Sequence, residues 1–213
     1  MLTIHAADLL LTAVPGAAPV PGGAVVVDGG TIAALGPYEE LAAAHPAARV
    51  RRWPGVLAPG LRQARAAWLL AHAYHPDPRE YAELGDAMLT GDRLAALDLP
   101  ETRWSGSVRR GLQLMLRHGT TAVAGPFDDP VISTAVARSG LRVVPGPAVV
   151  GEADLDPLCG VRELAAAVAA PLVVGGRADL AAFAVSDEEA LLAQGAGACV
   201  ATVLAGRLVF RGR

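Results

Sequence analysis

Helices and short apolar strands alternate through the middle of the chain. Residues 105–118 carry apolar side chains at helical spacing, and residues 120–124 then predict a short buried strand. A second helix over residues 129–139 and a second strand over residues 141–144 follow. Parallel strands need a crossover connection, which is usually a helix. The alternation therefore predicts a parallel sheet covered by helices.

The two ends of the chain have a different pattern, which is typical of antiparallel strands and tight turns. Asp28-Gly29-Gly30 lies between two apolar runs, and Ala205-Gly206 lies between two more, so each end predicts a hairpin. We also expect helices over residues 38–48, 156–170 and 188–194, an edge strand over residues 49–53, and a cap at Ser105 or Ser107.

Composition excludes several classes of protein. The net charge is −3 and the arginines are scattered, so no basic surface for nucleic acid is expected. The apolar run over residues 9–27 contains three prolines, which excludes a membrane-spanning helix there. We expect no membrane partner, no secretory signal and a cytoplasmic location. Cys159 and Cys199 lie far apart and are expected to be buried thiols, with a disulfide or a metal pair as the alternative.

Within the stretch Trp53–Ala67, a short apolar run is followed by Pro59-Gly60-Leu61. It resembles the first barrel strand of the amidohydrolase superfamily, in which P-G-L-x-D-x-H-x-H carries two metal-binding histidines. Here Gln63 stands at the Asp position, and Arg65 and Ala67 stand at the two His positions. A guanidinium has no lone pair to donate to a cation, so the resemblance implies the scaffold without the metal ligands.

Two further stretches are similar to the imidazolonepropionase-like and deaminase-like branch of that superfamily. Residues 116–125 read LRHGTTAVAG, with Gly125 in place of an Asp, and residues 135–142 read AVARSGLR. The resemblance implies an α/β plus β fold. A small β-sandwich, the composite domain, would be built from residues 1–55 together with 175–213. A truncated, partial TIM-like α/β barrel over residues 56–174 would be inserted into it, because that range is about half of the ~250 residues that a complete barrel needs.

Chemistry at a metal site is hard to assemble from the remaining residues. The family carries its later ligands on later barrel strands, and no histidine follows His118. The absence of lysine also excludes a carbamylated lysine and Schiff-base catalysis. His72 and His75 are the best alternative, since residues i and i+3 share one face of a helix, with Asp77 or Glu80 as a third ligand. Surface histidines near a helix end are the competing interpretation.

Three other residues are candidates for ligand binding. Arg65 would bind an anion or pair with a neighbouring acid, and Asp128 and Asp129 follow a strand on the side where barrel active sites lie. Helix capping explains the two aspartates equally well. We expect His118, next to Gly119, to contact the last carbonyls of its helix.

The resemblance and the missing ligands together give the functional prediction. We expect a catalytically inactive, metal-free relative of the amidohydrolases that acts as a binding or scaffold subunit. The alternative is a hydrolase of carbon–nitrogen bonds in cyclic amides or amino-heterocycles, with zinc in a non-standard or partner-completed site. Expected partners are a second copy of the chain or an intact amidohydrolase, because a few parallel strands leave open edges. A third possibility is that the chain binds a small molecule in the substrate cleft that the resemblance implies.

Overall fold

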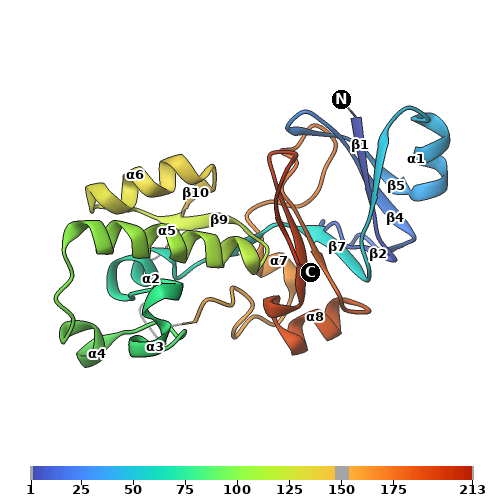
Figure 1. Ribbon diagram of the computed structural model, residues 1–213. Helices are drawn as coiled ribbons and strands as arrows, with labels where there is room; N and C mark the ends of the chain where they lie inside the picture. The colour runs from blue at the N-terminus through green and yellow to red at the C-terminus, as the bar shows by residue number, and fades with distance from the viewer. Residues whose placement is uncertain (1, 147–153, 213) are drawn as a thin grey trace.

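The computed structural model describes residues 2–146 and 154–212. Strands from both chain ends gather on one side of the molecule, and most of the helices surround a smaller sheet on the other side (Figure 1). The architecture is a mixture of three sheets and helices. No helix among the described residues is long and apolar enough to cross a membrane.

The first sheet is formed by the N-terminal strands. Its order is β5-β4-β1-β6, with β1 and β4 antiparallel and β6 parallel to β1. The predicted hairpin at Asp28-Gly29-Gly30 and the predicted edge strand are both present. Apolar side chains of β1 and β4 pack under helix α1 on one face. The elements are β1 (Leu2–Ala6), β4 (Gly23–Asp28), β5 (Thr31–Pro37), α1 (Tyr38–Ala44) and β6 (Arg49–Arg52).

The second sheet combines strands from both ends of the chain. Its order is β13-β12-β11-β7-β2-β3, and β12 and β13 form the predicted C-terminal hairpin. Val25 and Val27 of the first sheet pack against Leu57, Leu180 and Val203 of the second, so the two sheets share a core. The strands are β2 (Leu9–Leu10), β3 (Val20–Pro21), β7 (Val56–Pro59), β11 (Leu180–Phe183), β12 (Cys199–Leu204) and β13 (Arg207–Arg211).

The third sheet is the parallel sheet that the helix–strand alternation predicted. Its order is β10-β9-β8, and both pairings are parallel. Buried apolar side chains of α2, α5 and α6 pack with Val123 of the central strand. The elements are β8 (Leu61–Gln63), α2 (Ala66–His72), α5 (Glu101–Arg117), β9 (Thr120–Gly125), α6 (Pro130–Ser139) and β10 (Arg142–Pro145).

Gly60 divides the opening stretch between two sheets. The strand before it, β7, pairs with β11, and the strand after it, β8, pairs with β9. The Gly60 N–H donates to the Asp179 carbonyl at 3.0 Å. A Cβ on Gly60 would overlap the side chain of Thr121, so only glycine fits where the chain passes from one sheet to the other.

Two helix predictions are wrong. The helix expected over residues 156–170 is reduced to α7 (Leu164–Ala167), because Asp154 and Asp156 accept backbone N–H groups two residues further on and fold turns instead. The cap expected at Ser105 or Ser107 is also absent. Helix α5 starts earlier, after Pro100, and the buried Ser107 hydroxyl instead accepts the His75 N–H at 2.8 Å.

Short helices connect the larger elements. Before α5, the Glu80 carboxylate accepts from the Tyr74 hydroxyl at 2.7 Å and from Arg103 at 2.8 Å, which fixes this region against the helix. The predicted helix at residues 188–194 is confirmed as α8. The short elements are 3-10 helix η1 (Pro78–Glu80), α3 (Tyr81–Leu84), α4 (Gly91–Ala95), α8 (Glu188–Gln194) and 3-10 helix η2 (Ala196–Ala198).

The two cysteines differ in their surroundings. Both are free thiols, but only Cys199 is buried, so the expectation of a buried thiol is wrong for the exposed Cys159. Burial raises the pKa of the Cys199 thiol to about 11. Cys199 is therefore protonated and unreactive at neutral pH.

Candidate functional site

Gln63, which stands at the Asp position of the motif, has a structural role. Gln63 is fully buried at the end of β8. Its side-chain oxygen accepts the Arg65 N–H at 3.0 Å, and its side-chain nitrogen donates to the Leu155 carbonyl at 2.9 Å. The amide therefore connects the strand end to the segment that returns after β10. Both of its polar ends are engaged in holding the backbone.

Arg65 and Ala67 do not lie on a strand. The strand ends at Gln63, and the run AAWLLAH that follows is rich in strong helix formers, so helix α2 begins at Ala66. Arg65 immediately precedes this helix, and its side chain makes no hydrogen bond or ion pair with residues 2–146 or 154–212. Its Nε atom is buried without a partner. Among the described residues no acid pairs with Arg65, and anion binding by this side chain stays a prediction.

The aspartate pair follows β9 as expected, but its members differ. Asp129 is the N-cap of α6, and its carboxylate accepts the N–H groups of Val131 at 2.7 Å and Ile132 at 3.2 Å. Asp128 is exposed and makes no such contact. No hydrogen bond or ion pair joins either aspartate to Arg65. Capping accounts for Asp129, and the three candidates are not connected into one site by direct contacts.

The paired arrangement of His72 and His75 is wrong. Helix α2 ends at His72, and the chain then becomes extended at Ala73 because Tyr74 forms a bridge with Leu89. His72 is exposed and lies against Trp68, whereas His75 is 1% exposed. The two rings therefore do not share a helix face. Across residues 2–146 and 154–212, no group of three or more His, Cys, Asp or Glu side chains is arranged to hold a metal ion.

His75 is a buried polar group that sequence reasoning placed on the surface. Neither ring nitrogen makes a hydrogen bond, and the ring packs closely on Gly111 of α5. Burial, with a smaller effect of the nearby Arg110 guanidinium, lowers the pKa of His75 to about 4, against a small opposing effect of the Leu69 carbonyl. The imidazole is therefore neutral at pH 7. Its main-chain N–H and carbonyl are held by Ser107 and Arg110.

His118 behaves as predicted. It follows the last residue of α5, and its Nδ1 atom lies 2.9 Å from the Leu114 carbonyl oxygen. The ring therefore satisfies one of the terminal carbonyls of the helix. Gly119 follows with a φ of 72°, a backbone conformation that ends the helix and that glycine adopts without strain. No catalytic role is needed to explain this histidine.

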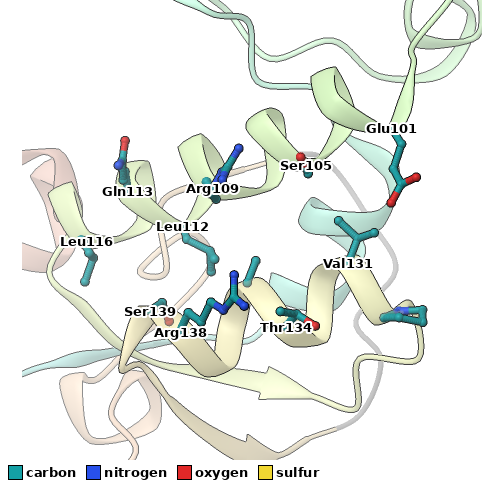
Figure 2. Close-up of a pocket in the computed structure, with 12 residues that line it drawn as sticks. Glu101, Ser105, Arg109, Leu112, Gln113, Leu116, Val131, Thr134, Arg138 and Ser139 are labelled. Atoms are coloured by element: carbon teal, nitrogen blue, oxygen red, sulfur yellow. The ribbon is translucent and has the colours of Figure 1, made fainter.

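A groove between α5 and α6 was missed by sequence reasoning. It has a volume of about 530 Å³, and Figure 2 shows Leu112 and Leu116 of α5 pointing toward α6, with Arg138 of α6 extending toward α5. Glu101 and Val131 lie at its other end. Neither Arg138 nor Glu101 makes an ion pair with another residue in the described part of the chain. The lining residues Leu112 and Leu116 of α5 are four residues apart, as are Val131 and Ala135 of α6. This spacing is the signal in the sequence that indicates two facing helix surfaces.

The groove is suited to a ligand with an apolar body and a charged end. Its volume lies in the range of small-molecule sites, and its lining combines apolar side chains such as Leu112 and Leu116 with arginine, glutamate and hydroxyl groups.

Comparison with known proteins identifies one part of the chain. Residues 23–48 match the family model described as an imidazolonepropionase-like composite domain of bacteria. These residues form the β4–β5 hairpin and α1. No curated protein matches the chain.

Several solved structures are similar over about two thirds of this chain. The A. niger ochratoxinase is 21% identical with a TM-score of 0.45, covering 68% of this chain and 30% of its own. The Helicobacter pylori aminofutalosine deaminase is 17% identical with a TM-score of 0.47, covering 68% and 33%. The E. coli guanine deaminase is 18% identical with a TM-score of 0.41, covering 68% and 36%. This chain thus spans about a third of the length of these proteins.

The family match falls on the N-terminal hairpin and helix, the same part of the chain that the sequence assigned to a composite domain. In the motif of the opening stretch, Gln63 stands at the Asp position, and Arg65 and Ala67 stand at the two His positions. Residues 23–48 are therefore similar to an imidazolonepropionase-like composite domain.

Proposed function

We propose that this chain is a catalytically inactive, metal-free relative of the amidohydrolases that acts as a binding or scaffold subunit. The observation that carries the proposal is the role of the residues that stand at the Asp and His positions of the motif. Gln63 holds the backbone with both ends of its amide, and position 67 lies inside a helix. Metal-assisted hydrolysis needs at least three ligands and an open coordination position.

The proposed division of the chain supports this function. We propose that residues 1–55 with 175–213 form the composite β-sandwich and that residues 56–174 form a partial barrel. The shared core of the two larger sheets and the parallel order β10-β9-β8 support it. Strand β7 falls in the second range by number but pairs with β11, so the physical transition between the two parts is at Gly60.

Restoring the missing ligands tests the proposed loss of function. The triple variant Gln63→Asp, Arg65→His, Ala67→His should still bind less than about 0.1 zinc per chain and hydrolyse no cyclic amide or aminopurine. The reason is that positions 65 and 67 flank the start of α2 and that no later ligand is available. Metal analysis after dialysis against zinc, with the wild-type protein as the control and circular dichroism as the folding check, measures this. One zinc per triple-variant chain would mean that a latent ligand set exists.

A partner is part of the proposal, because one edge of the parallel sheet is open. Within residues 2–146 and 154–212, no strand pairs with the outer edge of β10. Val143 on this strand is 51% exposed. Exposed apolar edge strands in native proteins are usually covered. We propose that a second copy of the chain, or an intact amidohydrolase, covers this edge.

Self-association is therefore the expected state of the isolated protein. Sedimentation at micromolar concentration should give twice the chain mass of 21.7 kDa. Val143→Glu should shift the equilibrium toward the monomer by about tenfold or more, because a charge at a buried contact is costly. Val209→Glu is the matched control, since Val209 is 40% exposed on the separate strand β13. A strict monomer that gains no mass with an intact amidohydrolase would contradict the proposed partner.

A further inference from the structure

The groove between α5 and α6 offers apolar surface from both helices. Leu112 and Leu116 line it on the α5 side, and Val131 and Ala135 line it on the α6 side. Leu112 is 3% exposed, so it forms part of the base of the groove, and the other three side chains are half-buried. An apolar chain or ring placed in the groove would remove this surface from water, which is favourable.

Arginines from both helices line the same groove. Arg138 extends from α6 toward α5 (Figure 2), and Arg109 lines the groove from α5. Neither guanidinium makes an ion pair or a hydrogen bond with residues 2–146 or 154–212. Arginine is charged at any ordinary pH. Within the described part of the chain, these two positive charges of the groove are therefore uncompensated, and both attract an anion that lies between the helices.

A hydroxyl group lies on the same face of α6 as Arg138. Thr134 precedes Arg138 by one helical turn, and both side chains line the groove. The exposed Thr134 hydroxyl makes no hydrogen bond within the described ranges, so it can donate to an anion. The hydroxyls of Ser105 and Ser139 already donate to backbone carbonyls of their own helices. The donors for an anion are thus concentrated around Arg138.

An acidic side chain at the other end of the groove gives it a direction. Glu101 is the first residue of α5 and lies near Val131. It precedes Arg109 by eight residues, which is about 12 Å along a helix axis. Its carboxylate repels an anion at that end. The negative group of a ligand is therefore favoured at the arginines, with the apolar body extending toward Val131.

We propose that the groove between α5 and α6 binds a small amphipathic monocarboxylate. Arg138 and Arg109 hold the carboxylate, because the planar guanidinium fork matches its two oxygens. The apolar body lies on Leu112. The inference rests on the proposed function, since it gives the binding subunit a ligand. None of the residues at the Asp and His positions of the opening motif lines this groove.

Titration of the nitrogen-15-labelled full chain with octanoate, followed by two-dimensional NMR, tests the site. Amide signals of α5 and α6 should shift and saturate with a Kd of about 1 mM or tighter. Octan-1-ol lacks the charge and acetate lacks the apolar body, so each should bind about tenfold more weakly or less tightly still. If either compound bound as tightly as octanoate, the groove would not recognise an amphipathic anion and the proposal would be overturned.

A pair of matched variants tests the assigned arginine. Arg138→Gln should weaken octanoate binding about tenfold, because it removes a charge-assisted hydrogen bond. Arg117→Gln is the control, since Arg117 lies in the last turn of α5 as Arg138 lies in the last turn of α6, but outside the groove. Both changes remove a charge that favours a helix end, so only the ligand contact differs. Equal losses in the two variants would overturn the proposal. If Arg138→Gln does not fold, Arg109→Gln replaces it.

Two other results of the titration would also overturn the site. One is the absence of saturable shifts up to about 20 mM octanoate. The other is a shift of the same α5 and α6 amides when the protein is diluted without ligand, which would assign the groove to a second copy of the chain. Metal content, measured separately, tests the loss of hydrolysis, so a negative titration overturns the groove site alone.

Discussion

Gly55→Ala is expected to lower the free energy of unfolding by about 3–5 kcal/mol, by adding backbone strain to a collision with backbone atoms. Gly55 has a φ of 69°, and a Cβ there would meet the carbonyl oxygens of Phe183 and Val185 and, at 2.8 Å, the Val185 nitrogen. Backbone atoms of a strand end cannot move away as a flexible side chain can. Urea denaturation followed by circular dichroism measures the loss.

Gly16→Ala separates the two causes of that loss. Gly16 has a similar φ of 76°, but no atom lies within 4 Å of the position of its added Cβ. Only the conformational cost remains there, so we expect a loss of about 1 kcal/mol. If both variants lost the same free energy, the close approach of the Gly55 backbone to the end of β11 would be wrong.

Phe183→Ala is expected to have the second large effect, a loss of about 3–5 kcal/mol. Phe183 is fully buried in β11 and is among the largest buried side chains. Its ring packs on Gly119, directly before the central strand β9 of the parallel sheet. Its removal leaves a cavity between the second sheet and the α/β part, and both should be destabilised together.

The cooperativity of unfolding shows whether Phe183 connects the two parts. Circular dichroism and tryptophan fluorescence should give coincident urea transitions for both wild type and variant. Phe210→Ala, at a half-buried position on β13, is the control, and it should lose no more than about 1.5 kcal/mol. A loss below about 1 kcal/mol for Phe183→Ala would contradict the packing described for this ring.

Local signals in the sequence were sufficient for much of the fold. The turn at Asp28-Gly29-Gly30, the cap at Asp129 and the left-handed Gly140 each act within a few residues, and the structure has the hairpin and helix that they predict. The parallel pairing of β9 with β10 followed from the helix between them. These features depend on neighbours in the chain.

Long-range contacts account for the errors. The division at Gly60 depends on Thr121 and Asp179, which lie far along the chain, so the opening stretch gave no sign of it. His75 is buried because Tyr74 pairs with Leu89 and because Gly111 leaves space for the ring. Helical spacing alone placed it beside His72 on the surface. Tertiary contacts override local preference at such positions.

The candidate site shows the same limit. The sequence identified which residues stand at the metal-ligand positions, because that depends on residue type alone. It did not show that Gln63 would connect β8 to the Leu155 carbonyl, nor that Arg65 would have no ion-pair partner among the residues that the structure describes. Those outcomes depend on where the segment after β10 returns.

Metal content of the wild-type protein is the most direct test of the central proposal, which is that this chain no longer carries a catalytic metal centre. The protein is purified without chelator from cells grown with added zinc, and metals are measured by mass spectrometry. We predict less than about 0.1 equivalent of any divalent transition metal per chain, because residues 2–146 and 154–212 bring together no three side chains that could hold such an ion. About one equivalent per chain, retained through dialysis, would contradict it.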